Sequence, residues 1–450
     1  SLSVLTAILM FDIRFSVSGD DSAYVIRAHD FVKEFTYPGF QGPLYPFVLS
    51  PMVLLFGVNA IAMKSLSILF LAGFLYFTFR AFRHRIPATL AMAALLLISF
   101  NSFILYFASQ TYSEMFFMFL QALMIFTLFT LFPEKGESKP LSSAWRSYFL
   151  LGLCILALGL TRSIGFTAAM VVPAFFLLRG SWRDLLLIVA VTLVLIVAFQ
   201  GFKYLVWGSA DFNLSDQGNA LLNKNYYKPS MGREDLAGFL DRLVKNSNSY
   251  ISRHFYTMFG FRPFNVELSI LPWLNVLTWV VLFGGVILYF RKNRYLLYLA
   301  LHAVVFLAVS FIILQTNWEQ TRIILPFVLY LMTGLLATFY YILSIKPLTR
   351  FQWIFPLGIL VIMGLNLSAT SVVFREARKV DGIYYGLTPD WENYAKMSKW
   401  ASDNLPDTAV VACRKPSISF IYGNKARFFG IMALPNYSVG RLMEEWKTKK

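Results

Sequence analysis

The sequence is poor in charged residues. Only 14% of its 450 residues are Asp, Glu, Lys or Arg, whereas 57% are hydrophobic, and the mean hydropathy is +0.60. A soluble globular domain carries about 25% charged residues. This scarcity, together with apolar runs of spanning length, excludes an ordinary soluble protein and indicates that lipid is the solvent for most of the chain.

Cysteine and histidine are also scarce. Cys154 lies in an apolar run and Cys413 in a polar tail, so no disulfide is expected. The four histidines have no ligand-like spacing, and neither a Walker loop nor a Gly-x-Ser-x-Gly elbow occurs. The sequence therefore predicts no metal cluster of Cys and His, and no P-loop or hydrolase-type site.

The net charge of +16 does not indicate a nucleic-acid partner, because the basic residues are scattered singly between apolar runs. The sequence begins inside an apolar run without an initiator methionine and stops in a lysine-rich stretch. We therefore expect a fragment of a longer chain, without a cleavable signal peptide.

A helix rises about 1.5 Å per residue and a bilayer core is about 30 Å thick, so a span needs about 20 apolar residues. About eleven transmembrane helices are predicted on this basis. They lie up to residue 10 and at 61–79, 88–107, 112–132, 147–161, 164–178, 184–206, 271–290, 295–314, 323–344 and 352–373.

The distribution of basic residues predicts the orientation of these helices. If the first span leaves the cytoplasm, the internal loops are 80–85, 133–146, 179–183, 291–294 and 346–350, which together hold thirteen Lys and Arg residues. The short external turns carry only Arg162 and Arg322. Cytoplasmic loops are enriched in Lys and Arg, so this orientation is favoured.

Three longer segments then lie outside the cytoplasm: the loops 12–60 and 207–270, and the region from 374 onward. We predict a transmembrane module at 1–373 and an extracytoplasmic region at 374–450 that the end of the sequence cuts off. In that region, 391–401 reads as a helix and 409–412 as a strand, with a second strand at 417–422.

The external loops contain helices of their own. The segments 20–35 and 235–251 have apolar residues at helical spacing, which predicts amphipathic helices suited to the membrane interface. The apolar run 44–56 follows a turn-rich stretch and is too short to span. The predicted fold class is therefore an all-α polytopic membrane protein with interfacial helices in the first external loop and a small extracytoplasmic α/β tail.

Five short motifs occur in order along the chain, on the predicted external side. They are Asp20-Asp21-Ser22-Ala23-Tyr24, Gly42-Pro43-Leu44-Tyr45-Pro46-Phe47, Ser109-Gln110-Thr111-Tyr112-Ser113-Glu114, Leu160-Thr161-Arg162 and Arg322-Ile323-Ile324-Leu325-Pro326. In this order they resemble the GT-C superfamily, in particular the membrane glycosyltransferases related to protein O-mannosyltransferases and the lipid A aminoarabinose transferase. The resemblance covers the first third of the chain well, the Arg322 region loosely, and the middle loop and tail hardly at all.

The sequence also departs from that pattern. Where the aminoarabinose transferases have Lys-Pro-Pro, this chain has Gln41-Gly42-Pro43, so the lysine that would meet a lipid phosphate is absent. Ala23 stands where those enzymes place an arginine. The resemblance therefore does not extend to their sugar specificity.

The resemblance implies a GT-C-like fold and an inverting glycosyltransferase. Such an enzyme moves a sugar from a polyprenyl-phosphate donor to an extracytoplasmic protein, glycolipid or polysaccharide. It implies that Asp20 is the base for the acceptor, with Asp21 as a helper. The alternative for both carboxylates is capping of the helix that follows.

Candidate substrate-binding residues carry charge or belong to the motifs. Glu114, at the end of a span, binds sugar or acceptor hydroxyls or pairs with Lys64 or Arg162. Arg162 is the first candidate for the phosphate, with snorkelling to the interface as its alternative. The further candidates are Tyr45, Arg322, Arg253 and Lys228. Arg322 has a competing interpretation as an ion-pair partner of the nearby Glu319.

Two other classes of protein remain open at this point: a transporter or flippase for lipid-linked saccharides, and a non-catalytic envelope assembly protein. A transporter would carry ionisable residues midway along its spans, and the predicted spans are nearly free of charge. No cofactor is expected to be required, although a divalent cation near Asp20 is compatible with the sequence. The expected location is the bacterial cytoplasmic membrane, with the site on its extracytoplasmic side.

Overall fold

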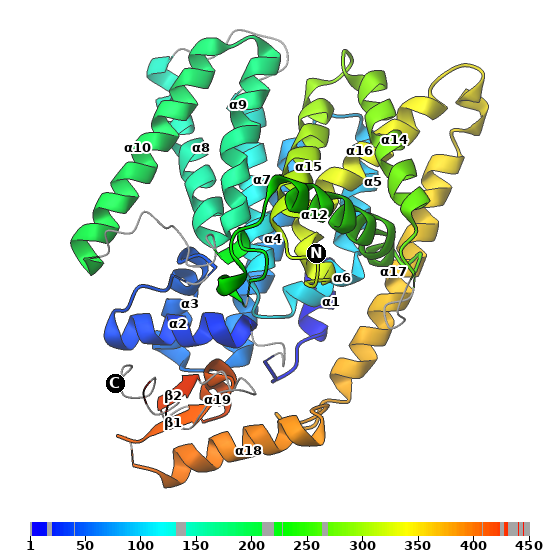
Figure 1. Ribbon diagram of the computed structural model, residues 1–450. Helices are drawn as coiled ribbons and strands as arrows, with labels where there is room; N and C mark the ends of the chain where they lie inside the picture. The colour runs from blue at the N-terminus through cyan, green and yellow to red at the C-terminus, as the bar shows by residue number, and fades with distance from the viewer. Residues whose placement is uncertain are drawn as a thin grey trace.

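The computed structural model describes residues 2–15, 20–39, 41–131, 141–208, 220–226, 228–262, 269–406, 408–423 and 427–430, together with residues 440 and 444; for 141–144 it describes the backbone only. The predicted loop 133–146 lies mostly outside this part of the chain. The described residues form a helical bundle with a small α/β unit at one end (Figure 1).

Helices occur at all eleven positions predicted to span the membrane. They are α1 (Leu2–Leu9), α4 (Ala60–Phe82), α5 (Ala88–Ser99) with α6 (Ser102–Ala108), α7 (Ser113–Leu131), α8 (Leu141–Thr161), η1 (Ser163–Thr167) with α9 (Ala168–Arg179), α10 (Trp182–Trp207), α14 (Pro272–Tyr289), α15 (Arg294–Ile313), α16 (Val328–Leu343) and α17 (Ile354–Arg378). Within the described residues, seven helical segments are long and apolar enough to cross a membrane, or eight if α5 and α6 form one span. The exact number of spans therefore stays a prediction.

The predicted span 88–107 is broken in the structure. Helices α5 and α6 meet at an angle of 54°, and Asn101 lies at the break. Its side chain caps α6 by accepting hydrogen bonds from the backbone N–H groups of Phe103 and Ile104, and it donates to the Met258 carbonyl oxygen at 2.9 Å. An Asn at the N-cap starts a new helix in this way, which a hydropathy window does not detect.

The bundle has a centre and a periphery. Helices α7 and α15 and the segment that ends in α16 are mostly buried, and α7 packs against both α4 and α8. Helices α10 and α17 bury few of their residues and expose many apolar side chains. Exposed apolar helices at the rim of a bundle are what a lipid solvent allows.

The short basic loops lie together at one end of the bundle. Asn293 donates a hydrogen bond to the Arg85 carbonyl oxygen at 2.7 Å, and Arg85 Nε donates to the Phe129 carbonyl oxygen at the end of α7. The opposite end carries α2 (Asp20–Glu34), α3 (Leu44–Phe56) and the C-terminal unit (Figure 1). The positive-inside rule then predicts that α2 faces away from the cytosol.

The helices predicted within the external loops are present. Helix α2 packs against α3, which in turn contacts α4 and α8. In the middle loop, a short 3-10 turn η2 (Pro229–Met231) precedes α12 (Leu236–Ser249), which continues as the π-helical turn η3 (Tyr250–Phe255) and α13 (Tyr256–Met258). The 3-10 turns η4 (Thr321–Ile323) and η5 (Leu325–Phe327) lead into α16, and η6 (Leu348–Phe351) precedes α17.

The C-terminal unit corrects one prediction. The expected helix 391–401 lies within α18 (Pro389–Asn404), and the strand 409–412 overlaps β1 (Val410–Cys413). The strand expected at 417–422 is wrong, because these residues belong to α19 (Pro416–Gly423). The second strand is β2 (Arg427–Gly430), which pairs in parallel with β1. Parallel neighbours need a crossover, and α19 supplies it.

Candidate active site

Four charged side chains from distant parts of the sequence meet at the end of the bundle that carries α2. Asp20 begins α2, Glu114 lies in the first turn of α7, Arg162 follows α8, and Arg322 lies in η4. We call these residues the Asp20 cluster. Both carboxylates sit at helix N-termini, where the helix dipole favours a negative charge.

Arg322 joins the two carboxylates of the cluster. Its Nη2 forms an ion pair with Asp20 Oδ2, and its Nη1 lies 3.7 Å from Glu114 Oε1. The guanidinium also donates through Nε to Gln320 at 2.7 Å and lies over the ring of Tyr112. The pairing with Glu319 that the sequence suggested does not form, because Glu319 pairs with Arg253 instead.

Arg162 binds the second carboxylate. Its Nη1 donates to Glu114 Oε1 at 2.7 Å and lies 3.5 Å from Ser113 Oγ. Burial alone would lower the pKa of the Arg162 guanidinium, but the Glu114 carboxylate raises the pKa above its ordinary value. Arg162 therefore points into the cluster as a permanent cation, and does not snorkel toward the interface.

Glu114 has unused hydrogen-bonding capacity. Its side chain is fully buried, and its Oε2 atom has no hydrogen-bond partner in the described part of the chain. A buried carboxylate oxygen without a donor is costly and rare in proteins. Such an atom fits a site that receives a hydroxyl donor from a ligand. Of the two structural partners weighed for Glu114, Arg162 is the one observed, and Lys64 pairs with Asp12.

Tyr24 and Ser113 complete the inner wall of the cluster. The Tyr24 hydroxyl lies 2.9 Å from Ser113 Oγ and donates to Gln41 Oε1. Burial raises the pKa of the Tyr24 phenol, so this group acts as a hydrogen-bond donor and not as a base. Helical spacing alone places Tyr24 on the apolar face of the predicted helix 20–35; its place in the motif with Asp20 is the signal that identifies it as part of the site.

The motif around Tyr45 supports the cluster through packing. Tyr45 is fully buried and meets Tyr24 edge to face, with ring centroids 5.0 Å apart. A Cβ atom on the preceding Gly42 would lie 2.2 Å from the Leu160 carbonyl oxygen, so only glycine fits at this approach. The Gly42 backbone therefore rests directly on the segment that carries Arg162.

Two predicted substrate-binding residues lie outside the cluster. Arg253, in η3, bonds Glu319 and Ser249. Lys228 is exposed and makes no ion pair with a described residue. The η3 turn nevertheless supports the segment before Arg322, because His254 Nδ1 lies 2.9 Å from Thr321 Oγ1. Burial lowers the pKa of His254 to about 4, so its ring is neutral at neutral pH.

The Asp21 side chain lies near a different set of charged residues from those around Asp20. Its side chain is fully buried, and its Oδ1 accepts a hydrogen bond from the Ser22 backbone at 2.7 Å. It interacts electrostatically with Lys64, which belongs to a second group of charges made of Asp12, Arg14 and Lys64. We call these three residues the Asp12 cluster. Adjacent carboxylates at the start of α2 thus face two separate clusters.

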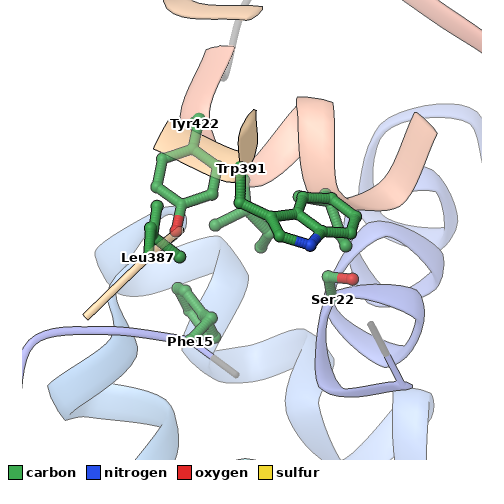
Figure 2. A pocket seen from close by; sticks show the side chains of 7 residues that line it. Phe15, Ser22, Leu387, Trp391 and Tyr422 are labelled. Atoms are coloured by element: carbon green, nitrogen blue, oxygen red, sulfur yellow. The ribbon is translucent and has the colours of Figure 1, made fainter. Parts of the chain in front are cut away.

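The C-terminal unit packs on the helix that carries Asp20. Helix α19 contacts α2, Ser22 donates a hydrogen bond to Ser417 at 3.2 Å, and the His29 and Phe420 rings lie 4.7 Å apart. Figure 2 shows the small pocket between them, where Trp391 and Tyr422 of the C-terminal unit face Ser22 and Phe15. The C-terminal unit therefore covers the face of α2 that carries Ser22 and His29.

Metal ligands are few around the cluster. Within the described residues, no group of three or more His, Cys, Asp or Glu side chains is arranged to hold a metal ion. Both carboxylates of the Asp20 cluster are already paired with arginines. The divalent cation that the sequence allowed near Asp20 stays a prediction.

Comparison with known proteins identifies the fold. No protein-family model matches the sequence, and no curated protein sequence matches it. Solved structures do match. The aminoarabinose transferase ArnT from Cupriavidus metallidurans, bound to undecaprenyl phosphate, aligns with a TM-score of 0.59 at 12% identity, covering 95% of this chain and 84% of that chain.

A second similar structure is the archaeal oligosaccharyltransferase AglB from Archaeoglobus fulgidus, in complex with an inhibitory peptide and a dolichol-phosphate. It aligns with a TM-score of 0.53 at 14% identity, covering 95% of this chain and 63% of that chain. Both are members of the GT-C superfamily. The chain is therefore an integral membrane protein with the GT-C fold, and the resemblance inferred from its motifs is confirmed at the level of the fold.

Proposed function

We propose that the protein is an inverting glycosyltransferase that moves a sugar from a polyprenyl-phosphate donor to an extracytoplasmic acceptor. The observation that carries this proposal is the Asp20 cluster, in which a carboxylate, two arginines and an unsatisfied buried carboxylate oxygen meet. The two similar GT-C structures, one with undecaprenyl phosphate and one with a dolichol-phosphate, support a lipid phosphate as the ligand.

The chemistry assigns Asp20 the role of general base. The acceptor oxygen or nitrogen attacks the anomeric carbon, and its proton passes to the Asp20 carboxylate. The bond between the anomeric carbon and the phosphate oxygen breaks, and the leaving polyprenyl phosphate keeps the electron pair. A single displacement of this kind inverts the anomeric configuration.

The arginines stabilise the leaving group. A planar guanidinium with several donors suits a phosphate oxygen better than a lysine ammonium does. Arg162 and Arg322 therefore take the role of the lysine that the Gln41-Gly42-Pro43 sequence lacks. Glu114 Oε2 accepts a hydrogen bond from a sugar or acceptor hydroxyl. We expect no cofactor to be required.

The remaining candidates have supporting roles in the proposal. Tyr45 and Arg253 position Tyr24 and the segment before Arg322, respectively, through the contacts described above. Asp21 helps to hold the first turn of α2. Lys228, exposed in the middle loop, is the candidate for a contact with the lipid headgroup. The proposed location is the bacterial cytoplasmic membrane, with the cluster on its extracytoplasmic side and a protein, glycolipid or polysaccharide as acceptor.

A donor screen tests the proposal. The purified full chain in lipid nanodiscs is incubated with a panel of polyprenyl-phosphoryl hexoses and pentoses, each with a mixture of acceptors, with and without EDTA. We expect one donor to release free polyprenyl phosphate, and the Asp20→Asn variant to lose that release.

The matched control is Glu376→Gln, which removes an exposed carboxylate in α17 that pairs with Lys379 at 2.7 Å. This variant is expected to retain full turnover. If no donor is consumed under any condition, the glycosyltransferase proposal is wrong. Transfer of an intact lipid-linked saccharide across the membrane without release of phosphate would favour the flippase class instead.

A further inference from the structure

Arg322 contacts several protein groups in this structure. Its Nη2 pairs with Asp20, its Nε donates to Gln320, its Nη1 faces Glu114 at 3.7 Å, and its plane covers Tyr112. The bond between Arg322 and Asp20 therefore occupies two groups that the proposed reaction needs. While it is in place, Asp20 Oδ2 already accepts a hydrogen bond from Arg322, and Arg322 has fewer donors for a phosphate.

We propose that Arg322 is exchanged between Asp20 and the phosphate of the lipid donor, so that donor binding itself frees the base. This inference rests on the proposed function and adds to it an order of events. The donor must bind before the acceptor is deprotonated. An acceptor that arrives first meets an aspartate that is still paired.

The contacts explain why Arg322, and not Arg162, is the exchanged cation. Arg162 donates to the fully buried Glu114 at 2.7 Å, whereas Arg322 lies 3.7 Å from it, so removal of Arg162 would cost the buried carboxylate its hydrogen bond from the described residues. Asp20 keeps 24% of its side chain exposed, so water can solvate its carboxylate when Arg322 leaves. Arg162 is therefore the fixed phosphate ligand, and Arg322 is the mobile one.

The charges of the reaction fit this exchange. Two carboxylates and two guanidinium groups make the cluster neutral before the donor arrives. During transfer, Asp20 gains a proton and loses its negative charge, while the leaving phosphate changes from a diester to a monoester and gains one. The attraction between Arg322 and Asp20 therefore weakens, while the attraction between Arg322 and the phosphate becomes stronger. Loss of the proton from Asp20 afterwards restores the original pair and favours release of the lipid phosphate.

A double-mutant cycle on lipid binding tests the exchange. Affinity for undecaprenyl phosphate is measured by titration of the full chain in nanodiscs for wild type, Asp20→Asn, Arg322→Gln and the double variant. We expect Asp20→Asn to bind about tenfold more tightly than wild type, because Arg322 no longer has to leave a carboxylate. In the Arg322→Gln background the same substitution is expected to change the affinity by less than about twofold.

Several controls make the outcome decisive. Undecaprenol, which lacks the phosphate, should bind all variants equally, and Glu376→Gln should match wild type. Arg322→Lys is measured in parallel, because it keeps the charge if the glutamine variant does not fold. Equal tightening by Asp20→Asn in both backgrounds would show simple repulsion of the phosphate and overturn the exchange, as would no tightening in either. If wild type does not bind the lipid phosphate at all, the proposed function itself fails.

Discussion

Two clusters of charge lie at the α2 end of this protein, and they differ in how completely their carboxylates are bonded. In the Asp12 cluster, Lys64 Nζ donates to Asp12 Oδ1 at 2.8 Å and to its backbone oxygen at 2.9 Å, and Arg14 Nη2 donates to Oδ2 at 2.8 Å. Both oxygens of the Asp12 carboxylate are therefore satisfied. In the Asp20 cluster, Glu114 Oε2 has no donor within the described residues.

The difference separates a structural role from a chemical one. The Asp12 cluster ties the segment after α1 to α4, and through the bond from Arg14 to the Tyr385 carbonyl oxygen at 2.7 Å it also holds the C-terminal region. The Asp20 cluster draws on four helices or turns and keeps capacity for a ligand. A buried carboxylate with both oxygens bonded stabilises the fold, whereas one with an unbonded oxygen is a candidate for binding or catalysis.

The largest expected effect is that of Asp20→Asn on turnover. Removal of a general base costs about 10³-fold in rate, so release of polyprenyl phosphate at saturating donor should fall by about that factor. The midpoint of thermal unfolding should fall only slightly, because a partly exposed ion pair contributes about 1 kcal/mol or less. A variant that retains wild-type turnover would remove Asp20 from the mechanism.

The second effect is a loss of stability without a loss of turnover, expected for Asp12→Asn. The substitution removes the carboxylate charge that pairs with the fully buried Lys64, and loss of one charge from a buried pair costs about 3 kcal/mol. Thermal unfolding followed by intrinsic fluorescence in detergent should show a clear loss of stability, with kcat retained in the folded fraction. A loss of kcat without a loss of stability would contradict the division between the two clusters.

The third effect concerns Gly42→Ala. The added Cβ would lie 2.2 Å from the Leu160 backbone oxygen, so the segment carrying Arg162 must move. A displacement of this kind in a phosphate ligand is expected to lower kcat/KM for the donor about tenfold. The matched control is Gly201→Ala in α10, where a Cβ meets no atom within 4 Å. Equal activity of the two alanine variants would show that Gly42 does not position Arg162.

The smallest expected effect is on how the stability of the fold depends on pH below about pH 5. Burial alone would raise the pKa of Asp12, but Lys64 and Arg14 more than offset it and lower the pKa below its usual value. Stability from this carboxylate is therefore present above about pH 4, the value in an unfolded chain, and is lost as the pH falls toward the lower folded pKa. Unfolding midpoints measured from pH 5 to 3 should fall more steeply for wild type than for Asp12→Asn.

Much of the fold could be predicted from the sequence, because spans, amphipathic faces and basic loops are local patterns. Each of the eleven apolar stretches forms a helix, and the segments 20–35, 44–56 and 235–251 form α2, α3 and α12. The break at Asn101 and the helix at 416–423 were missed. In both places a hydrogen-bonding or crossover requirement overrode local hydropathy.

The motifs contain all four members of the Asp20 cluster, but they do not show how these residues pair. Asp20, Glu114, Arg162 and Arg322 were all named from motifs, and the structure brings them together. Sequence proximity suggested that Arg322 pairs with Glu319, but the η3 turn places Arg253 beside Glu319 and leaves Arg322 for Asp20. The role of the Tyr24 hydroxyl could not be predicted from local spacing, because its partners, Ser113 and Gln41, lie on other segments.

The sequence by itself determined that this is an integral membrane protein, which stretches form its apolar helices, and which charged residues gather at one end of the bundle. These properties follow from the length of apolar runs and the cost of charge in lipid, and both act locally along the chain. Only the tertiary structure decided which carboxylate pairs with which cationic side chain. An ion pair requires its charged atoms to lie within a few ångströms of each other, and these residues are up to 302 positions apart in the sequence. That choice leaves Asp12 with both carboxylate oxygens bonded and Glu114 with one oxygen that no described residue bonds.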